Sequence, residues 1–207
     1  FYVLSRYEDI LRALRKPQIF SSAQGLTPAE DEIAQLGLPP TFIMMDPPDH
    51  TRLRRLITKA FTPDTVKELE PTIRDFVVDA IETMKLKAAD GEEVDLIEAI
   101  ASPLPTMVVA NILGVPSEDR ERFDPWSDAI TSASADFALD VKEAIGAVQG
   151  LVSYFGAMCQ ARRANPTDDM ISKLTQAEID GDNLTDWDIL GFCFVMIAGG
   201  NDTTTNL

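Results

Sequence analysis

The sequence predicts a mainly α protein with minor β structure, and three features of the chain carry this prediction. Apolar residues recur at intervals of three and four over most of the 207 residues, which is the spacing of amphipathic helices. Glycine and proline follow where several of these runs stop. Strand-like patterns are confined to Val94 and Leu96 and to the first residues of the chain. The chain is therefore expected to be largely helical.

Several of the expected helices have a recognisable start or stop. Thr62 and Pro63 begin a helix of about five turns that runs to Met84, since threonine suits an N-cap and proline suits the first turn. Gly114 and Pro116 end the next one. The other expected elements are a strand at 1–4, helices at 104–113, 141–164, 168–174 and from 185 onward, and a helix that opens at 117–119. The Pro- and Gly-rich stretch 25–48 is expected to be a loop with one short helix.

The composition excludes several classes of function. Asp and Glu outnumber Lys and Arg by 34 to 18, and the net charge of −16 disfavours nucleic acid or an anionic membrane as a partner. The single histidine, His50, excludes a multi-histidine zinc site and disfavours a Ser-His or Cys-His catalytic pair. Cys159 and Cys193 are too few for a disulfide framework and indicate a reducing compartment. The uncharged run at 189–198 is far shorter than the ~20 residues that span a bilayer, so it is expected to be buried.

Both ends of the chain resemble cuts through structural elements. The chain begins within an apolar segment at Phe1, without an initiator methionine. It stops at Leu207 without the cap or polar tail that ends a helix. No linker divides the sequence. We therefore expect residues 1–207 to be one incomplete domain of a longer protein.

A first unusual stretch runs from Met45 to Leu56 and contains the pair Pro47-Pro48. The prolines predict an extended approach to a helix that Asp49 can cap. His50 and Arg54 then lie one helical turn apart on the same face. A histidine and an arginine placed in this way suit a ligand with carboxylates, because arginine offers two parallel donors and histidine a third. The same spacing is common on a solvated basic helix face, which is the alternative.

A second unusual stretch, 198–205, breaks the rules of helix propensity. Gly199 and Gly200 each cost ~1 kcal/mol relative to alanine in a helix, and three consecutive threonines add to this. Glycine allows a ligand to approach the backbone, and the hydroxyl of Thr203 can turn back to the carbonyl of Gly199. Asp202 is then a polar group able to relay protons. The alternative is a helix crossing that requires small residues.

Taken in order, these stretches resemble the N-terminal half of a cytochrome P450, a haem-thiolate monooxygenase of the soluble bacterial type. The segments that carry the resemblance are 6–10 with 20–22, 46–55 with 60–63, and 199–204. The resemblance covers essentially the whole chain. It implies an incomplete cytochrome P450 fold, haem as cofactor, and the insertion of one oxygen atom from O₂ into a small apolar organic substrate. A cytoplasmic location without membrane or nucleic-acid partners is also expected.

The resemblance assigns roles to individual residues. His50 and Arg54 would bind the haem propionates, and Gly199 and Gly200 would leave room for dioxygen above the porphyrin. Thr203 would hold water at the oxygen site, and Asp202 would help deliver the protons for O–O cleavage. The stretches 25–48 and 123–139 and the residues before 198 would line the substrate side. Arg52, Arg55 and Lys59 would form a basic patch for an electron-donating ferredoxin or flavodoxin, with a solvated helix face as the alternative.

Two family features are missing from the sequence. The family needs a cysteine thiolate as the fifth iron ligand, and neither Cys159 nor Cys193 has the surrounding glycine and basic residue. Both are expected to be small core residues, so no metal ligand is assigned within this segment. The Glu-x-x-Arg pair is also absent. The 207-residue chain alone is therefore expected to be inactive, and a haem-free helical ligand-binding or relic protein is the alternative function. A helical regulatory dimer is the least favoured alternative.

Overall fold

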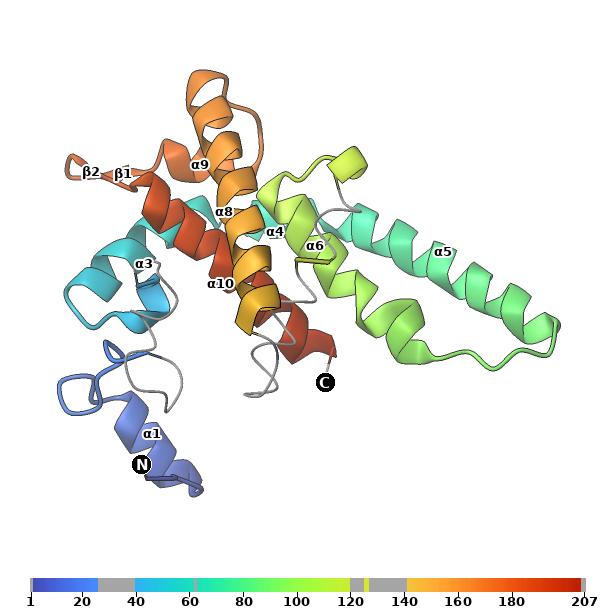
Figure 1. Cartoon of the computed structure of the whole chain (residues 1–207), viewed down its shortest axis with the longest axis horizontal. Coiled ribbons are helices and arrows are strands. Elements are labelled where there is room, and N and C mark those ends of the chain that lie inside the picture. The colour runs from blue at the N-terminus through green and yellow to red at the C-terminus, as the bar shows by residue number, and fades with distance from the viewer. Residues whose placement is uncertain (1, 26–39, 62, 120–124, 127–140, 206–207) are drawn as a thin grey trace.

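The computed structural model describes residues 2–25, 40–61, 63–119, 125–126 and 141–205. Helices dominate this part of the chain, and its only sheet is a two-stranded hairpin, so the prediction of a mainly α protein with minor β structure is confirmed. Figure 1 shows α10 running through the centre, with α3 and the hairpin on one side and α5 projecting on the other. None of the helices in the described ranges has the length and hydropathy needed to cross a membrane.

Helix α10 (Asp186–Thr205) forms the centre of the core. It packs against α6 (Pro103–Leu113), α8 (Val141–Ala164) and α9 (Met170–Thr175). Its buried residues point in several directions, which is typical of a helix enclosed by others. The predicted start is confirmed: the backbone N–H of Thr185 donates to the Asp188 carboxylate at 2.8 Å, and the N–H of Asp188 donates to the Thr185 hydroxyl at 3.2 Å.

Helices α6, α8 and α9 meet at one junction. Gly114 ends α6 as predicted, with φ +77° in the left-handed region, and an added Cβ there would lie 2.5 Å from Asp169. Asp169 begins α9 by accepting the N–H of Ser172 at 2.7 Å. It also pairs with Arg162 in the last turn of α8. The Asp169 carboxylate thus bonds to the end of α8 and the start of α9 and packs against the end of α6.

Helix α3 (Asp49–Ala60) packs on α9 and on the short helix η1 (Phe42–Met44). Leu53, Leu56 and Ile57 are buried, and Phe61 meets Phe192 of α10 edge-on at 5.9 Å between ring centroids. The prediction that Asp49 caps this helix is wrong. Pro48 occupies the N-cap position and Asp49 is the first helical residue, where its charge still favours the helix N-terminus.

The long helix predicted from Pro63 to Met84 is two helices. The first, α4 (Pro63–Lys67), ends before Pro71. The second, α5 (Glu70–Ala89), begins with Pro71 in its first turn. Proline has no N–H to donate and its ring clashes with the preceding turn, so one helix cannot continue through Pro71. No residue of α5 is buried.

Both predicted strands are absent from the described residues. Residues 2–5 have no regular structure before α1 (Tyr7–Leu14), and no strand lies beside them in the described part of the chain. Near Val94, the side chain of Asp95 accepts the N–H groups of Ile97 and Glu98 and starts the π-helical turn η2 (Ile97–Ala101). A short helix η3 (Ser117–Asp119) opens at the predicted place.

The strands that do form were not predicted. β1 (Glu178–Ile179) pairs with β2 (Asp182–Asn183) in an antiparallel hairpin. Asp180 and Gly181 connect them with φ angles of 56° and 82°, which is the conformation of a type I′ turn. An Asp-Gly pair at such a turn is the sequence signal that identifies it.

Candidate functional site

His50 lies in the first turn of α3 with its ring against η1. The imidazole stacks on Phe42, with 6.4 Å between ring centroids and 25° between ring planes, and its backbone N–H donates to the carbonyl of Asp46 at 3.1 Å. The ring makes no hydrogen bond to the described residues. Its nitrogens therefore remain available to a ligand. Phe42, which stacks on the ring, lies in η1, within the stretch 25–48 that the sequence predicted to be a loop with one short helix.

Arg54 lies one turn after His50 and is exposed. Its guanidinium makes no ion pair or hydrogen bond within the part of the chain that the structure describes, whereas its carbonyl accepts the Thr58 hydroxyl at 2.7 Å. A histidine and an arginine with unused donors on adjacent turns fit the two carboxylates of haem. That His50 and Arg54 contact the haem carboxylates stays a prediction.

Thr203 and Gly199 lie one turn apart near the end of α10. The Thr203 hydroxyl donates to the Gly199 carbonyl at 2.7 Å, which confirms the hydrogen bond expected from their spacing. An added Cβ on Gly199 would have no described neighbour within 4 Å. Gly199 is thus not required by packing among the described residues, which agrees with space kept for a small ligand.

Gly200 has a different environment. An added Cβ there would lie 2.9 Å from Cγ2 of Val109 on α6, so this glycine permits a close helix crossing. The Thr204 hydroxyl donates to the Gly200 carbonyl at 3.0 Å, in the same way as Thr203 does one residue earlier. Packing accounts for Gly200, and its predicted place beside dioxygen stays untested.

Other predicted residues lie partly outside the described part of the chain. Asp202 is in α10, but its side chain is not described. Most of the expected substrate-lining stretches 25–48 and 123–139 also lies outside it, at 26–39, 123–124 and 127–139. Helix η1 contacts both α3 and α10, and an added Cβ on Gly191 of α10 would lie 3.4 Å from Thr41, the residue before η1. No hydrogen bond or ion pair between described residues joins His50 or Arg54 to Thr203.

Both cysteines are core residues, as predicted. Cys159 on α8 and Cys193 on α10 have no exposed surface and no disulfide. Burial raises the pKa of Cys159 to about 11 and the pKa of Cys193 well above its ordinary value. Iron ligation requires the thiolate, which this environment disfavours. Among the described residues, no group of three or more His, Cys, Asp or Glu side chains suits a metal ion.

The predicted basic patch is partly occupied. Arg52 pairs with Asp182 at 3.0 Å, and Lys59 donates to the Glu178 carbonyl at 2.6 Å. Arg55 is exposed and has no such partner among the described residues. Only part of the patch is therefore open to a partner.

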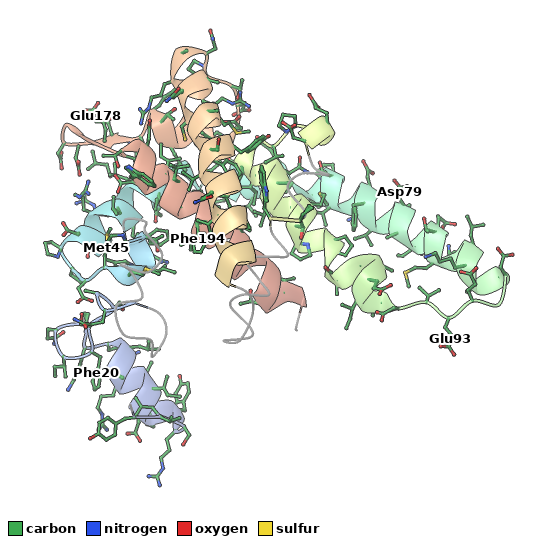
Figure 2. The ribbon with its side chains drawn as sticks, in the orientation of Figure 1. Phe20, Met45, Asp79, Glu93, Glu178 and Phe194 are labelled. Carbon is green, nitrogen blue, oxygen red and sulfur yellow. The ribbon has the colours of Figure 1, made fainter. Side chains whose placement is uncertain are left out.

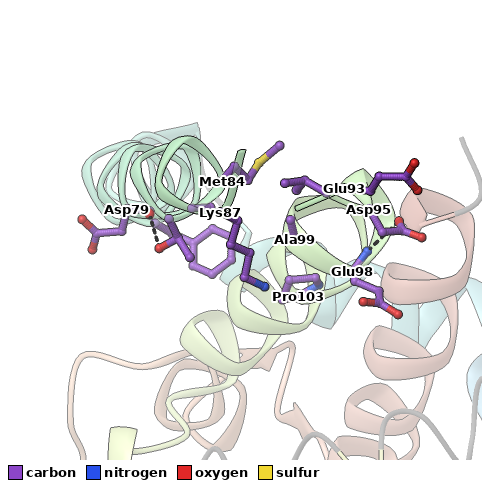
Figure 3. Close-up of a pocket in the computed structure, with 12 residues that line it drawn as sticks. Asp79, Met84, Lys87, Glu93, Asp95, Glu98, Ala99 and Pro103 are labelled. Carbon is purple, nitrogen blue, oxygen red and sulfur yellow. Dashed lines mark hydrogen bonds between the residues drawn. The ribbon is translucent and has the colours of Figure 1, made fainter. Parts of the chain in front are cut away.

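A cavity of about 520 Å³ lies between α5 and the η2–α6 segment (Figure 3). Asp79, Glu93, Asp95 and Glu98 line it together with Lys87, and none of the predicted site residues does. Four carboxylates against one lysine disfavour the propionates of haem. This cavity is not the predicted haem site.

Comparison with known proteins places the chain in a family. A family model described as Cytochrome P450 matches residues 1–206. Cytochrome P450 130 of Mycobacterium tuberculosis is 45% identical over 212 residues, which cover 100% of this chain and 51% of that protein. Erythromycin C-12 hydroxylase of Saccharopolyspora erythraea is 38% identical over 210 residues, covering 98% and 49%.

The fold agrees with this placement. The structure of Cytochrome P450 CYP109Q5 from Chondromyces apiculatus superposes with a TM-score of 0.81 at 32% identity, covering 98% of this chain and 49% of that chain. The chain thus spans about half the length of the curated relatives it matches. These observations confirm the incomplete cytochrome P450 fold that the sequence predicted. The chain belongs to the cytochrome P450 family.

Proposed function

We propose that the protein carrying this chain is a haem-dependent monooxygenase. In the overall reaction, one atom of O₂ enters an apolar organic substrate, and the other leaves as water after taking up two electrons and two protons. Family membership supports this proposal, and the single observation in the structure that supports it most is the Thr203–Gly199 hydrogen bond beside an open glycine. A related protein named a hydroxylase of erythromycin supports an organic substrate.

His50 and Arg54 are the proposed contacts to the haem carboxylates. Their donors are unused by the described residues, and the imidazole of His50 stacks on Phe42. Haem, when bound, supplies the electron and O₂ chemistry of the reaction. The part of this chain is to hold the carboxylates and to shape the space beside α10. Because neither buried cysteine suits the iron, the thiolate is proposed to come from outside residues 1–207.

Thr203 and Asp202 are the proposed route for protons. The Thr203 hydroxyl uses its hydrogen on the Gly199 carbonyl, so its oxygen lone pairs are free to accept a hydrogen bond from water. A water held there is close to the space that Gly199 leaves open. Asp202, the preceding residue, is the proposed acid that renews the proton on this water.

The proposed electron donor is a small acidic ferredoxin or flavodoxin that binds the basic side of α3, which is the surface formed by Arg52, Arg55 and Lys59. Arg55 and Lys59 supply its positive charge, and the contact is expected to weaken with salt. A cytoplasmic location is part of the proposal, supported by the two free cysteines.

The test compares Thr203→Ala with Thr204→Ala in haem-loaded protein that carries the cysteine ligand. Both changes remove a hydroxyl that donates to the carbonyl four residues earlier. The acceptor of the Thr204 hydroxyl is the carbonyl of Gly200, which packs on Val109. Thr203→Ala is expected to raise peroxide release per product at least severalfold, because Thr203 positions the water that is the proposed proton donor, and a positioned proton donor contributes about 10²–10⁴ in rate. Equal peroxide-to-product ratios in the two variants would contradict the role of Thr203. Thr203→Ser, which keeps the hydroxyl, is expected to restore coupling.

A further inference from the structure

The β1–β2 hairpin lies against the basic side of α3, at the edge of the molecule where Figure 2 labels Glu178. Arg52 donates from Nη1 to both carboxylate oxygens of Asp182, at 3.1 and 3.0 Å. Lys59 donates from Nζ to the backbone carbonyl of Glu178 at 2.6 Å. The partners are 130 and 119 residues apart in the sequence, so these contacts exist only because the chain folds the hairpin onto α3.

The two contacts have different electrostatic consequences. Asp182 carries a full negative charge and neutralises Arg52, and its hydrogen bond is the main reason that the pKa of Arg52 is raised. The Glu178 carbonyl carries no net charge, so Lys59 keeps its positive charge. Arg55 is exposed and bonds to no other described residue. An anionic partner therefore meets two available cations, Arg55 and Lys59, whereas Arg52 is already paired with Asp182.

The Arg52–Asp182 pair is suited to exchange. Its side chains are 42% and 41% exposed, and ion pairs of this exposure contribute little to stability. A carboxylate from another protein can replace Asp182 at Arg52 without unpacking the core, because Leu53, Leu56 and Ile57 hold α3 in place independently. The hairpin carboxylate thus behaves as a weak internal ligand.

We infer that Asp182 competes with an acidic electron donor for Arg52, so that the hairpin limits how tightly the basic side of α3 binds that donor. This inference rests on the proposed function, which brings the donor to α3. The donor displaces Asp182: it gains an ion pair with Arg52 only as the pair between Arg52 and Asp182 breaks. The hairpin therefore keeps the complex weak, as a transient electron-transfer contact requires.

The test uses Asp182→Asn with Asp180→Asn as its matched control, in the haem-loaded protein. Both changes remove one negative charge from the hairpin, but Asp180 lies at the turn and bonds to no other described residue, and asparagine tolerates its φ of 56°. The probes are an acidic [2Fe–2S] ferredoxin and inorganic tripolyphosphate, titrated at low and at physiological salt. Asp182→Asn is expected to tighten the binding of both probes about two- to fivefold more than Asp180→Asn does, with the gain reduced at the higher salt.

Arg52→Gln completes the cycle. It is expected to change ferredoxin binding little in the parent protein and to abolish the gain in the Asp182→Asn background. Equal effects of Asp182→Asn and Asp180→Asn on both probes would overturn the inference. A gain for tripolyphosphate without one for ferredoxin would support occupation of Arg52 by Asp182 but overturn the proposed donor surface. Loss of ferredoxin binding on Arg55→Gln, with or without an Asp182 effect, tests that surface separately.

Discussion

Gly199 and Gly200 are neighbours in the sequence but meet different surroundings. A methyl group on Gly200 would lie 2.9 Å from Val109, whereas one on Gly199 would meet no described atom within 4 Å. Glycine in a helix lowers stability, so a position without a packing reason for glycine calls for another reason. We propose that a ligand approaches the backbone at Gly199.

This difference predicts opposite effects on stability. Gly199→Ala is expected to raise the free energy of unfolding by up to ~1 kcal/mol, from helix propensity alone. Gly200→Ala is expected to lower it by roughly 1–2 kcal/mol, because overpacking against Val109 outweighs the gain in propensity. Denaturant unfolding measures both. A loss of stability in Gly199→Ala, or no rescue of Gly200→Ala by Val109→Ala, would show that these environments are wrongly described.

Sequence spacing predicts a contact between two residues only when they are close together in the sequence. The Thr203–Gly199 hydrogen bond follows from helical periodicity and was predicted. The Arg52–Asp182 pair joins residues 130 positions apart, and the contact of Gly200 with Val109 depends on a helix crossing. Neither leaves a periodic signal, so sequence reasoning left Arg52 in an open patch and grouped Gly200 with Gly199.

At the scale of elements, Asp169 joins the ends of α6, α8 and α9. Burial by itself raises the pKa of this carboxyl, but hydrogen bonds from the Ser172 backbone N–H, from Arg162 and from Thr167 outweigh it, and the pKa lies below its ordinary value. A carboxyl whose pKa is lowered by folding stabilises the protein above the pKa of the unfolded chain, about 3.9. That contribution is lost as the pH falls through the lower, folded-state pKa.

Asp169→Asn is therefore expected to lower the free energy of unfolding by roughly 1–3 kcal/mol at neutral pH and to flatten its decline below about pH 4. Asp168→Asn is the matched control, because the Asp168 side chain is 86% exposed and, among the described residues, pairs only with Lys173. Unfolding measured from pH 3 to 7 separates the two variants. A parallel acid decline in both would contradict the role of Asp169.

Gly114 at the same junction gives a second prediction. Gly114→Ala forces a side chain into the left-handed region, at φ +77°, and places its Cβ 2.5 Å from Asp169. Gly91→Ala has the same backbone strain, at φ +80°, but no atom within 4 Å. We expect a loss of about 1–2 kcal/mol for Gly91→Ala and at least ~1 kcal/mol more for Gly114→Ala, in thermal unfolding. Similar losses would mean that Asp169 moves aside freely.

Elements with strong end signals were predicted well, and the rest failed for identifiable reasons. The stop of α6 at Gly114 and the start of α10 at Thr185 follow from cap chemistry. The prediction of one helix across Pro71 was wrong because it relied on apolar spacing alone, whereas proline interrupts the backbone hydrogen bonds of a helix. The strand predicted at Val94 has no pairing partner in the described chain, and Asp95 starts a helical turn instead.

At the scale of the whole molecule, the described chain has a buried side and an open side. Residues of α3, α6, α8, α9 and α10 form one core, whereas α1 and α5 contribute no buried residue. Leu14 is 77% exposed, Leu86 70% and Ile97 55%. Relatives of about twice this length have further polypeptide to cover such surfaces. We propose that the candidate haem contacts His50 and Arg54 belong to a site that this chain builds only in part.

The spectrum of the isolated 207-residue chain tests that conclusion. Reduced with haem under CO, it is expected to show no thiolate-type Soret band, because Cys159 and Cys193 are fully buried with raised pKa values and would have to leave the core to reach iron. Cys159→Ser and Cys193→Ser are expected to leave the spectrum unchanged. A thiolate-type band that disappears in one of these variants would identify that cysteine as a ligand. It would also show that the core around α10 opens far more easily than its packing indicates.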